Sequence, residues 1–481
     1  MGPRPVGESE RFGALHVGKE AWNPQKGWTV PIAHIGKAKG NAPPSVLPHL
    51  QELRFLVVHP KKLHTAPTKA DEIEGMAEVT ILQVVPRLDA GGSEQATVEI
   101  ADALTRVGAS ALVATEGGRM ATAITQVGGE IIPLPMASKN PLTILANARR
   151  LRRLIEERKV DLVHARSRAP AWSAFLATRA TGRAFVTTYH GAYGSTGGPL
   201  KTAYNNVMGR GDRIIANSHY TAALIAERHP LARDRIRVIY RGIDAAMFGP
   251  FVVPPGPVAK LRESWGVSPD TKIVLQAARL TGLKGHRQTI EAASRLDREG
   301  ALESAVIVFA GDAPRKTGYR QELLDLIAHH ELGNKVRLVG HCQDMPAAFL
   351  AAHVAIVPSL VPETFGRTSV EAQAMGCPVI VSDLGALPET IISPEQDTAR
   401  FTGWLVPAND AGALADRLGL ALSLTPPERA KIGERATARV AVEFALAQMQ
   451  SKTLAVYDEL LGTRLAQRYA ESAGALTEEG R

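Results

Sequence analysis

Short apolar segments alternate with helical patterns along most of the chain, and this alternation constrains the fold more than any other feature. Helical patterns such as 94–107 and 142–158 separate the segments. Because parallel strands need helical crossovers, the pattern predicts an α/β fold whose sheets are covered on both faces. The predicted strands are 79–85, 109–114, 130–134, 160–165, 184–189, 212–216 and 235–240, followed by 272–278, 305–310, 335–339, 354–358 and 378–382.

The domain organisation follows from the length and from one interruption of this pattern. A chain of 481 residues is too long for one core, and the alternation stops where FVVPPGPV occurs. We therefore expect two doubly wound, Rossmann-like domains that face a cleft at the carboxyl ends of their strands. The expected parts are an N-terminal domain 76–249, a linker 250–270, a C-terminal domain 271–440, a helix 441–462 that crosses back to the first domain, and a tail 463–481.

The first 75 residues differ from the rest of the sequence. Residues 1–75 are rich in Pro, Gly, Lys and His, and QELRFLVV (51–58) is their only strand-like piece. We expect a disordered segment or a mis-assigned start, with the functional protein beginning near Met76. The opening MGPRPVGESERFG lacks the apolar segment of a secretion signal, and the two cysteines have no metal-ligand spacing. A reduced, cytoplasmic protein is the expectation.

The net charge of +8 favours an anionic partner. The basic residues are dispersed and no aromatic residues are interleaved among them, so nucleic acid is not an expected partner. The segment 147–159 is basic on one side. A solvated helix face is the ordinary interpretation of such a run, and peripheral contact with anionic lipid on the inner membrane face is the alternative.

The segment PETFGRTSVEAQAMGCPVI (362–380) has the form of an anion site. It follows the predicted strand AIVPSL, and Gly366 permits a close backbone approach at the start of a predicted helix. We expect the amides of Gly366, Arg367, Thr368 and Ser369 to be unpaired in the first turn and to favour a phosphate.

Two glutamates, Glu363 and Glu371, lie on either side of this turn. Carboxylates repel phosphate but accept hydrogen bonds from sugar hydroxyls, so Glu371 is expected to hold a ribose and Glu363 the other end of the ligand. A pyrophosphate between two sugars is a nucleotide sugar. Two glutamates at this spacing also arise by chance, and the strand–turn–helix context is what favours function.

Arg279 and Lys284 follow the strand 272–278 and precede a predicted helix. Arginine binds phosphate oxygens bidentately and lysine adds a point charge, so both are expected to stabilise a departing nucleoside diphosphate. An ordinary exposed loop is the alternative. The sequence contains no Asp-x-Asp motif, so we expect these cations, and no metal or other cofactor, to hold the diphosphate.

Several segments together resemble the retaining glycosyltransferases of family 4, which have the two-domain GT-B fold. The resemblance extends over about 79–462 and includes the Glu-x7-Glu signature of 363–371. The other similar segments are RLDAGGSEQATVEIADAL (87–104), TYHGAYG (188–194), VIYRGIDAAMF (238–248), AARLTGLKG (277–285) and TGWLVPANDAGALADRL (402–418).

The resemblance implies roles for further residues. His190 would lie close to the transferred sugar, as a hydroxyl or transition-state contact. Gly91 and Gly92 would lie near the diphosphate or the acceptor, although a simple tight turn capped by Ser93 explains them as well. On the donor side, the resemblance implies nucleotide contacts from Phe365, Gly366, Arg367, Thr368, Gly311, Gly340 and His341.

The sequence departs from the family at several positions, among them Ala313 in place of a glycine in the segment that begins with Gly311 and Asp312. Arg241 replaces the more usual Asn between the domains, and Arg367 and Thr368 stand where many relatives have apolar residues. None of these changes removes a residue expected in catalysis, and Arg367 is expected to add positive charge beside the anion site. Arg166, Ser167 and Arg168 are further candidates for acceptor contacts.

The sequence therefore predicts a retaining transferase that moves a hexose from a nucleotide sugar, with UDP as the commonest nucleotide, to a glycan or glycolipid acceptor. Glu363, His190, Arg279 and Lys284 are the expected catalytic residues. The resemblance points to bacterial envelope polysaccharide or lipopolysaccharide synthesis. The alternatives are a sugar-nucleotide epimerase and a non-catalytic sugar-binding protein. A dinucleotide oxidoreductase is disfavoured because PRLDAGGSE lacks the G-x-G-x-x-G motif.

Overall fold

The computed structural model describes residues 79–89, 91–191, 198–313 and 318–478 of the chain. The N-terminal extension predicted for residues 1–75 lies outside the described residues and stays a prediction.

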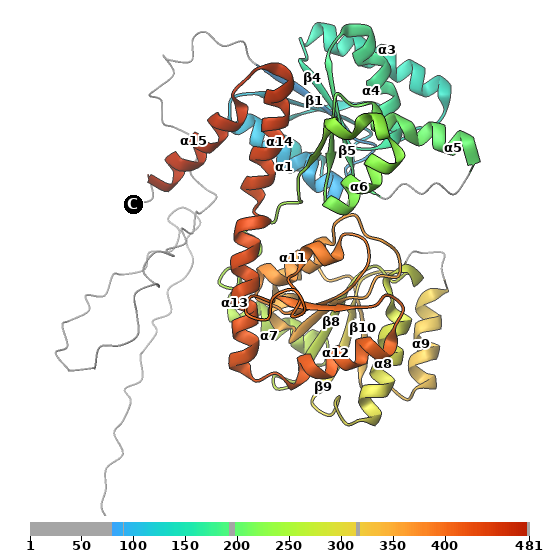
Figure 1. The fold of residues 1–481 in the computed structure, drawn as a ribbon, viewed down its shortest axis with the longest axis vertical. Helices are drawn as coiled ribbons and strands as arrows, with labels where there is room; N and C mark the ends of the chain where they lie inside the picture. The colour runs from blue at the N-terminus through green and yellow to red at the C-terminus, as the bar shows by residue number, and fades with distance from the viewer. Residues whose placement is uncertain (1–78, 90, 192–197, 314–317, 479–481) are drawn as a thin grey trace, which may run out of the picture. The chain divides into compact units, whose positions relative to one another are not determined.

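The first domain consists of parallel strands with a helix or a short 3₁₀ turn after most of them (Figure 1). Its strands lie within two residues of the predicted ranges at each end. They are β1 (Thr80–Val84), β2 (Ser110–Thr115), β3 (Glu130–Pro133), β4 (Leu162–Ala165), β5 (Ala184–Tyr189), β6 (Arg213–Ala216) and β7 (Ile236–Val238). The helices are α1 (Gly92–Arg106), α2 (Ala121–Gln126), α3 (Pro141–Glu157), α4 (Arg168–Thr181), α5 (Gly198–Asn205) and α6 (His219–Arg228), with 3₁₀ turns η2 (Asn206–Arg210) and η3 (Pro230–Arg235).

The second domain repeats this organisation. Its last strand, β13, was not predicted from the sequence. The strands are β8 (Lys272–Ala277), β9 (Ala305–Ala310), β10 (Val336–Gly340), β11 (Val354–Val357), β12 (Val379–Ser382) and β13 (Gly403–Val406). The helices are α7 (Pro255–Ser264), α8 (His286–Arg298), α9 (Tyr319–His329), α10 (Met345–Ala351), α11 (Arg367–Ala374) and α12 (Ala411–Ser423), with 3₁₀ turns η4 (Gly282–Lys284) and η5 (Leu387–Thr390).

The strand orders locate the point at which each sheet can bind a ligand. Within the described part of the chain, the sheets are β3-β2-β1-β4-β5-β6-β7 and β10-β9-β8-β11-β12-β13, and every paired strand is parallel to its neighbour. The direction of winding reverses between β1 and β4 in the first sheet, and between β8 and β11 in the second. Open α/β sheets bind ligands at such switch points, outside the carboxyl ends of the strands. The two predicted Rossmann-like domains are confirmed.

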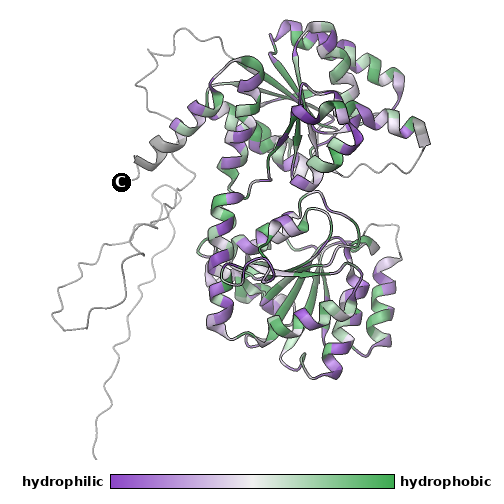
Figure 2. Cartoon of the chain, in the orientation of Figure 1, coloured by the Kyte–Doolittle hydropathy of each residue, from purple (hydrophilic) through white to green (hydrophobic). Residues whose placement is uncertain are grey.

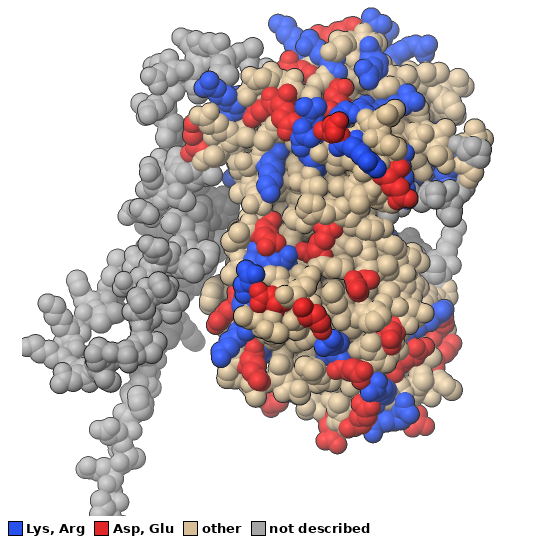
Figure 3. Space-filling model, viewed as in Figure 1, with Lys and Arg blue, Asp and Glu red and all other residues tan. Residues whose placement is uncertain are grey.

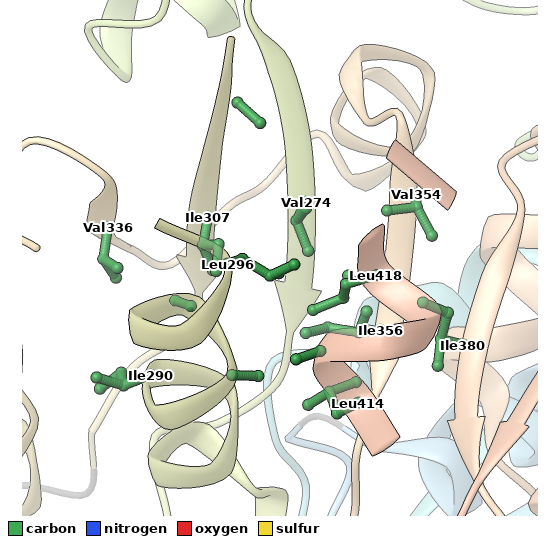
Figure 4. Packing of buried hydrophobic residues seen from close by; sticks show 14 of the residues in the cluster. Val274, Ile290, Leu296, Ile307, Val336, Val354, Ile356, Ile380, Leu414 and Leu418 are labelled. Carbon is green, nitrogen blue, oxygen red and sulfur yellow. The ribbon is translucent and has the colours of Figure 1, made fainter. Parts of the chain in front are cut away.

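The core of each domain lies between its sheet and its helices. Figure 2 shows the strands of both sheets as largely hydrophobic and the outward sides of the helices as hydrophilic. In the second domain, Val274, Ile307 and Ile356 of neighbouring strands pack with Leu296 of α8 and Leu418 of α12 (Figure 4). All five are at most 2% exposed, and each such side chain contributes roughly 1.5–3 kcal/mol on burial.

The predicted linker 250–270 contains a helix, α7, that was not predicted from the sequence. Helix α7 begins with Pro255, whose fixed φ suits a first helical position. Trp265 and Val267, just beyond the helix, are buried in a cluster of the second domain, and Val258 and Leu261 pack against that cluster. The Pro-rich stretch obscured the apolar spacing that drives this packing.

The C-terminal segment returns to the first domain through helix α14 (Leu446–Leu461), as predicted. Helix α13 (Pro426–Glu443) is followed by α14, which packs against α1. Met449, Leu454 and Tyr457 of α14 lie in the first domain's core cluster.

The predicted tail 463–481 also proves to be structured where it is described. It forms α15 (Leu465–Glu478), which packs on α14 (Figure 1). The side chains of Leu465 and Tyr469 are buried, and this burial holds the segment in place.

Charged side chains are distributed unevenly over the surface. Figure 3 shows Lys and Arg side chains gathered over the helices of the first domain at the top of the view, whereas both signs are intermixed over the second domain. Helix α3 contributes exposed arginines, of which Arg152 pairs with Glu156 at 2.9 Å. Its contact with lipid stays a prediction. Over the described residues, no helix combines the length and apolarity that crossing a membrane requires.

Replacing Leu418 by Ala should destabilise the second domain. Leu418 is fully buried among the strands and helix α8, so Leu418→Ala should lower the free energy of unfolding by about 2–5 kcal/mol. Leu420, two residues further along α12, is 48% exposed, so Leu420→Ala should change it by about 0.5 kcal/mol or less. Urea unfolding monitored by circular dichroism measures both. Equal effects of the two variants would contradict the described packing.

Candidate active site

A pocket of about 210 Å³ lies at the switch point of the second sheet. Its walls come from the carboxyl ends of β8 and β11 and from the loops that follow them. This is the place where the sequence predicts the diphosphate. The lining residues include four of the predicted site residues, Arg279, Lys284, Glu363 and Thr368, together with Gln276, Ala277, Ala278, Ile356, Val357, Pro358 and Ser359.

The pocket contains an ion pair between two predicted catalytic residues. Lys284 Nζ lies 2.7 Å from Glu363 Oε1, and both side chains are partly exposed, at 27% and 20%. The hydroxyl of Ser359 donates a hydrogen bond to the same carboxylate oxygen. Arg279 is exposed and lines the same pocket. The structure thus brings a carboxylate and two cations together, 79 positions apart in the case of Lys284 and Glu363.

The loop that carries Lys284 is held by a buried polar network. Gln276 is fully buried in β8, and its side-chain amide donates to the carbonyl of Lys284 at 2.7 Å. The Thr289 hydroxyl of α8 donates to the side-chain oxygen Oε1 of Gln276 at 2.8 Å. Gln276 was not predicted as a site residue, although a glutamine inside the apolar run KIVLQA indicates a buried polar contact.

Gly285 ends this loop in a conformation that only glycine adopts easily. Its φ is +75°, and a Cβ at this position would lie 2.0 Å from the carbonyl oxygen of Pro358. The loop can therefore approach the end of β11 closely enough for Lys284 to reach Glu363.

The turn before α11 is built largely as predicted. Gly366 occupies the N-cap with φ +94°, and a Cβ there would lie 2.5 Å from Leu387. One detail of the prediction is wrong: the amide of Ser369 donates to the carbonyl of Gly366 at 3.0 Å, so it is paired within the first turn. The tight 3₁₀-type bond takes it out of the set of amides open to a ligand.

Arg367 turns toward two carboxylates. Its Nε lies 2.7 Å from Glu371 Oε1, and its Nη1 lies 3.7 Å from Glu99 Oε1 on helix α1. Burial raises the pKa of Glu371, against the lowering effect of Arg367. Glu99 is 5% exposed and was not singled out from the sequence. Arg367 does not line the pocket described above, and the ribose-binding role of Glu371 stays a prediction.

The remaining predicted donor contacts are not among the residues that line this pocket. The ring of Phe365 is 4% exposed and packs with Tyr240 and Phe444, so a donor contact from this residue would fall to its backbone. The amide of Gly311 donates to the carbonyl of Gly340 at 2.7 Å, which joins the ends of two strands. His341 is exposed at the end of β10. Their roles toward a nucleotide stay predictions.

A second, smaller pocket lies at the carboxyl ends of β4 to β7 in the first domain. His190 and Arg241 line it, and the guanidinium of Arg241 donates to His190 Nδ1 and to the carbonyl of Gly92. Burial, followed by the charge of Arg241, lowers the pKa of His190 well below its ordinary value. The predicted residues His190 and Gly92 are thus joined by Arg241, which the sequence marked only as a departure from the family.

The prediction that Ser93 caps α1 needs correction. Ser93 does not cap α1, because the helix begins at Gly92 with Gly91 as its N-cap, and the Ser93 hydroxyl donates to Glu94 instead. Arg166 is 3% exposed, donates to Gln83 Oε1 at 2.9 and 2.7 Å, and lines the pocket. Its contact with an acceptor stays a prediction.

Thr364 connects His190 with the Glu363 segment. Its hydroxyl donates to the carbonyl of His190 at 3.4 Å, and Asn217 Nδ2 donates to that hydroxyl at 3.3 Å. The neighbour of Glu363 in the sequence is therefore bonded to the backbone of His190. The predicted catalytic residues converge on one region.

Two family models match the chain. The model described as "Glycosyltransferase Family 4" matches residues 90–246, and the one described as "Glycosyl transferases group 1" matches residues 258–439. A crystal structure of a glycosyltransferase from Rickettsia africae ESF-5 is 33% identical, has a TM-score of 0.72, and the match covers 80% of this chain and 99% of that chain. The chain therefore belongs to the glycosyltransferases of the family 4 type, with the GT-B fold, and is a transferase.

More distant relatives were also found. Anabaena Alr3699/HepE, whose structure is in complex with UDP and glucose, is 21% identical, with a TM-score of 0.68 and coverage of 80% of this chain and 100% of that chain. This likeness shows the fold alone. The D-inositol 3-phosphate glycosyltransferase of Mycobacterium tuberculosis is 29% identical over 276 residues, which are 56% of this chain and 53% of that protein. The chain spans about half the length of the curated relatives it matches.

Replacing Gly285 by Ala should disrupt the Lys284 loop. A left-handed φ costs an L-residue roughly 1–2 kcal/mol, and the crowding against Pro358 adds about 1–3 kcal/mol. Gly300 is the matched control, since its φ is +77° and the nearest atom to an added Cβ is a glutamate side-chain oxygen at 3.7 Å. Thermal unfolding and the KM for the donor sugar measure the effect. Equal losses in Gly285→Ala and Gly300→Ala would show that the close approach to Pro358 is unimportant.

Proposed function

We propose that this glycosyltransferase transfers a hexose from a nucleoside diphosphate sugar to an acceptor hydroxyl, with retention of the anomeric configuration. The observation that carries the proposal is the Lys284–Glu363 ion pair in a pocket at the switch point of the second sheet. Cations beside a carboxylate suit a ligand that has both a diphosphate and sugar hydroxyls.

The residues divide between the two ends of such a donor. Arg279 and Lys284 would bind the diphosphate oxygens and stabilise the negative charge that develops as the nucleoside diphosphate departs. Glu363 would accept hydrogen bonds from hydroxyls of the hexose. Ser359 and Lys284 hold the Glu363 carboxylate by direct hydrogen bonds, so it needs little reorganisation to do this.

The transfer replaces one bond to the anomeric carbon by another on the same face of the sugar. The bond from that carbon to the diphosphate oxygen breaks, and a bond to the acceptor oxygen forms. The acceptor's hydroxyl proton passes to the departing phosphate oxygen, so atoms and charge balance. In this scheme the protein binds, orients and excludes water, and the leaving group takes the proton.

The donor and the acceptor are proposed at different levels of detail. UDP-hexose is the proposed donor, supported by the fold shared with HepE, whose structure contains UDP and glucose. The proposed acceptor is a bacterial envelope glycan or glycolipid, including a lipopolysaccharide core. The support for it is the resemblance carried by the segments TYHGAYG and VIYRGIDAAMF. No metal is proposed in the reaction.

A donor screen should identify one class of nucleotide sugar. A ligand that binds the folded state raises the unfolding temperature by mass action, and at 100 times its Kd it adds about 2.7 kcal/mol. We expect a UDP-hexose to raise it more than GDP- or ADP-hexoses, and EDTA to leave the shift unchanged. A shift with none of the three classes would contradict the proposed function. Turnover of a donor to an epimer in the absence of an acceptor would favour the epimerase instead.

Replacing Glu363 by Gln should abolish transfer while the protein remains folded. The amide keeps the size of the carboxylate but loses its charge, so the release of nucleoside diphosphate should fall on the order of 10²–10³-fold. Glu291→Gln, on the exposed side of α8, is the control and should retain full activity. Circular dichroism verifies folding. Normal turnover by Glu363→Gln would remove this residue from the catalytic site.

A further inference from the structure

Arg241 is a buried cation, and the two hydrogen bonds that it donates within the described residues are to neutral groups. It is 8% exposed, and its guanidinium donates to the carbonyl of Gly92 and to Nδ1 of His190. A buried charge is costly unless its donors are used, so these two bonds fix the orientation of the side chain. Gly92 follows β1 and His190 follows β5, so Arg241 joins two loops at the same edge of the sheet.

The bond to Arg241 determines which nitrogen of His190 carries the proton. A guanidinium has donors only, so His190 Nδ1 must accept. In a neutral imidazole the proton then lies on Nε2, which becomes a donor. The neutral form is favoured because burial and the charge of Arg241 lower the pKa of His190 well below its ordinary value.

The Nε2 atom is where a substrate oxygen would be bound. It is buried and has no hydrogen-bond partner among the described residues. His190 lines the pocket at the ends of β4 to β7, and its carbonyl is bonded to Thr364, the neighbour of Glu363. An unpaired buried donor costs free energy until an acceptor reaches it.

Several charged groups near His190 affect its pKa. After burial, the charges of Arg241 and Arg166 lower the pKa of His190 most, and His164 lowers it as well. The two ring nitrogens of His164 contact Tyr457 and Thr188 at 2.7 and 2.6 Å. Burial, followed by the charges of Arg367 and Arg166, lowers the pKa of Arg241 to about 9. Glu99 and Glu94 of α1 act in the opposite direction and raise it.

We propose, on the basis of the proposed function, that Arg241 is a positioning residue that fixes His190 as an Nε2–H donor toward a substrate oxygen. In this role His190 does not act as a base through Nε2. Arg241 acts through His190, and His190 contacts the sugar or the departing phosphate. The proposed role specifies one tautomer of His190. An arginine that only stabilised the fold would not determine that tautomer.

The tautomer is measured directly in the unliganded protein. A long-range ¹H–¹⁵N spectrum of protein labelled with ¹⁵N-histidine separates protonated from unprotonated ring nitrogens, and His190→Gln assigns the signals. We expect His190 to have an unprotonated Nδ1 and a protonated Nε2 from about pH 8.5 down to about pH 5.5, on both sides of the ordinary histidine pKa of about 6.5. A protonated Nδ1 with a bare Nε2 would overturn the proposal, as would an ordinary titration. Because no donor is present, this result is independent of the proposed function.

The kinetics of Arg241 variants supply the second test. In Arg241→Met the neutral imidazole can take either tautomer and is no longer held in one orientation, so kcat should fall by up to about tenfold near pH 8, the value of one hydrogen bond. As the pH falls through the His190 pKa, the imidazolium carries a proton on both nitrogens and Nε2–H is restored. The rate of this variant should therefore rise relative to wild type at low pH.

Two further variants separate positioning from folding. Arg241→Lys keeps a donor for Nδ1 and should restore the pH-independent rate. Arg237→Met, which removes an exposed pair with Glu459 at 2.8 Å, is the control and should leave the rate unchanged. If Arg241→Met were slow by the same factor at every pH, or if Arg241→Lys were no faster than Arg241→Met, the proposal would be wrong. Inactivity of wild type with every donor would refute the proposed function alone, because the spectrum still reports the tautomer.

Discussion

Parallel pairing of the strands is the constraint on which the rest of the structure depends. When all strands of a sheet run in one direction, the loops that follow them meet at one edge. In the second sheet this places the loops after β8 and β11 side by side at the switch point, where the Lys284–Glu363 pair forms. In the first sheet it brings the segments after β5 and β7 together, so that Arg241 reaches His190. Residues far apart in the sequence therefore become neighbours in space, although no sequence pattern around either residue indicates the other.

Buried charge is the second organising feature, and it is distributed differently in the two regions. In the second domain, Lys284 and Glu363 compensate each other and remain partly exposed, so their charges stay accessible to a ligand. In the first domain, Arg241 is more deeply buried, and its resolved bonds are to a carbonyl and an imidazole. Bonds to neutral groups satisfy the donors, while Glu99 and Glu94 offset part of the cost of burying the charge without a direct bond. That difference separates a site that can bind charged oxygens directly from one that orients a neighbouring side chain.

The sequence was sufficient for the fold and for the identity of the central site residues. Apolar runs bounded by turns marked nearly every strand, because buried parallel strands are hydrophobic on both faces. Strand β13 was not predicted because GWLV is short, and helix α7 was not predicted because prolines are typical of a linker. Among site residues, Lys284 and Glu363 could be predicted since each follows a strand at the switch point. The approach of Arg367 to Glu99 could not, because the two residues lie far apart in the sequence and no local pattern encodes their contact.

Helix α14 shows how far the pocket of the first domain depends on the end of the chain. Met449 and Thr453 line that pocket, and Tyr457 contacts Nδ1 of His164 at 2.7 Å. His164 in turn contacts Thr188 on β5, two residues before His190. All these groups are buried, so each hydrogen bond that α14 supplies replaces one that water cannot provide. The crossing helix therefore does more than cover a hydrophobic face. It contributes Tyr457 to the polar network beneath His190, so the geometry of that pocket depends on α14 as well as on the strands of the first domain.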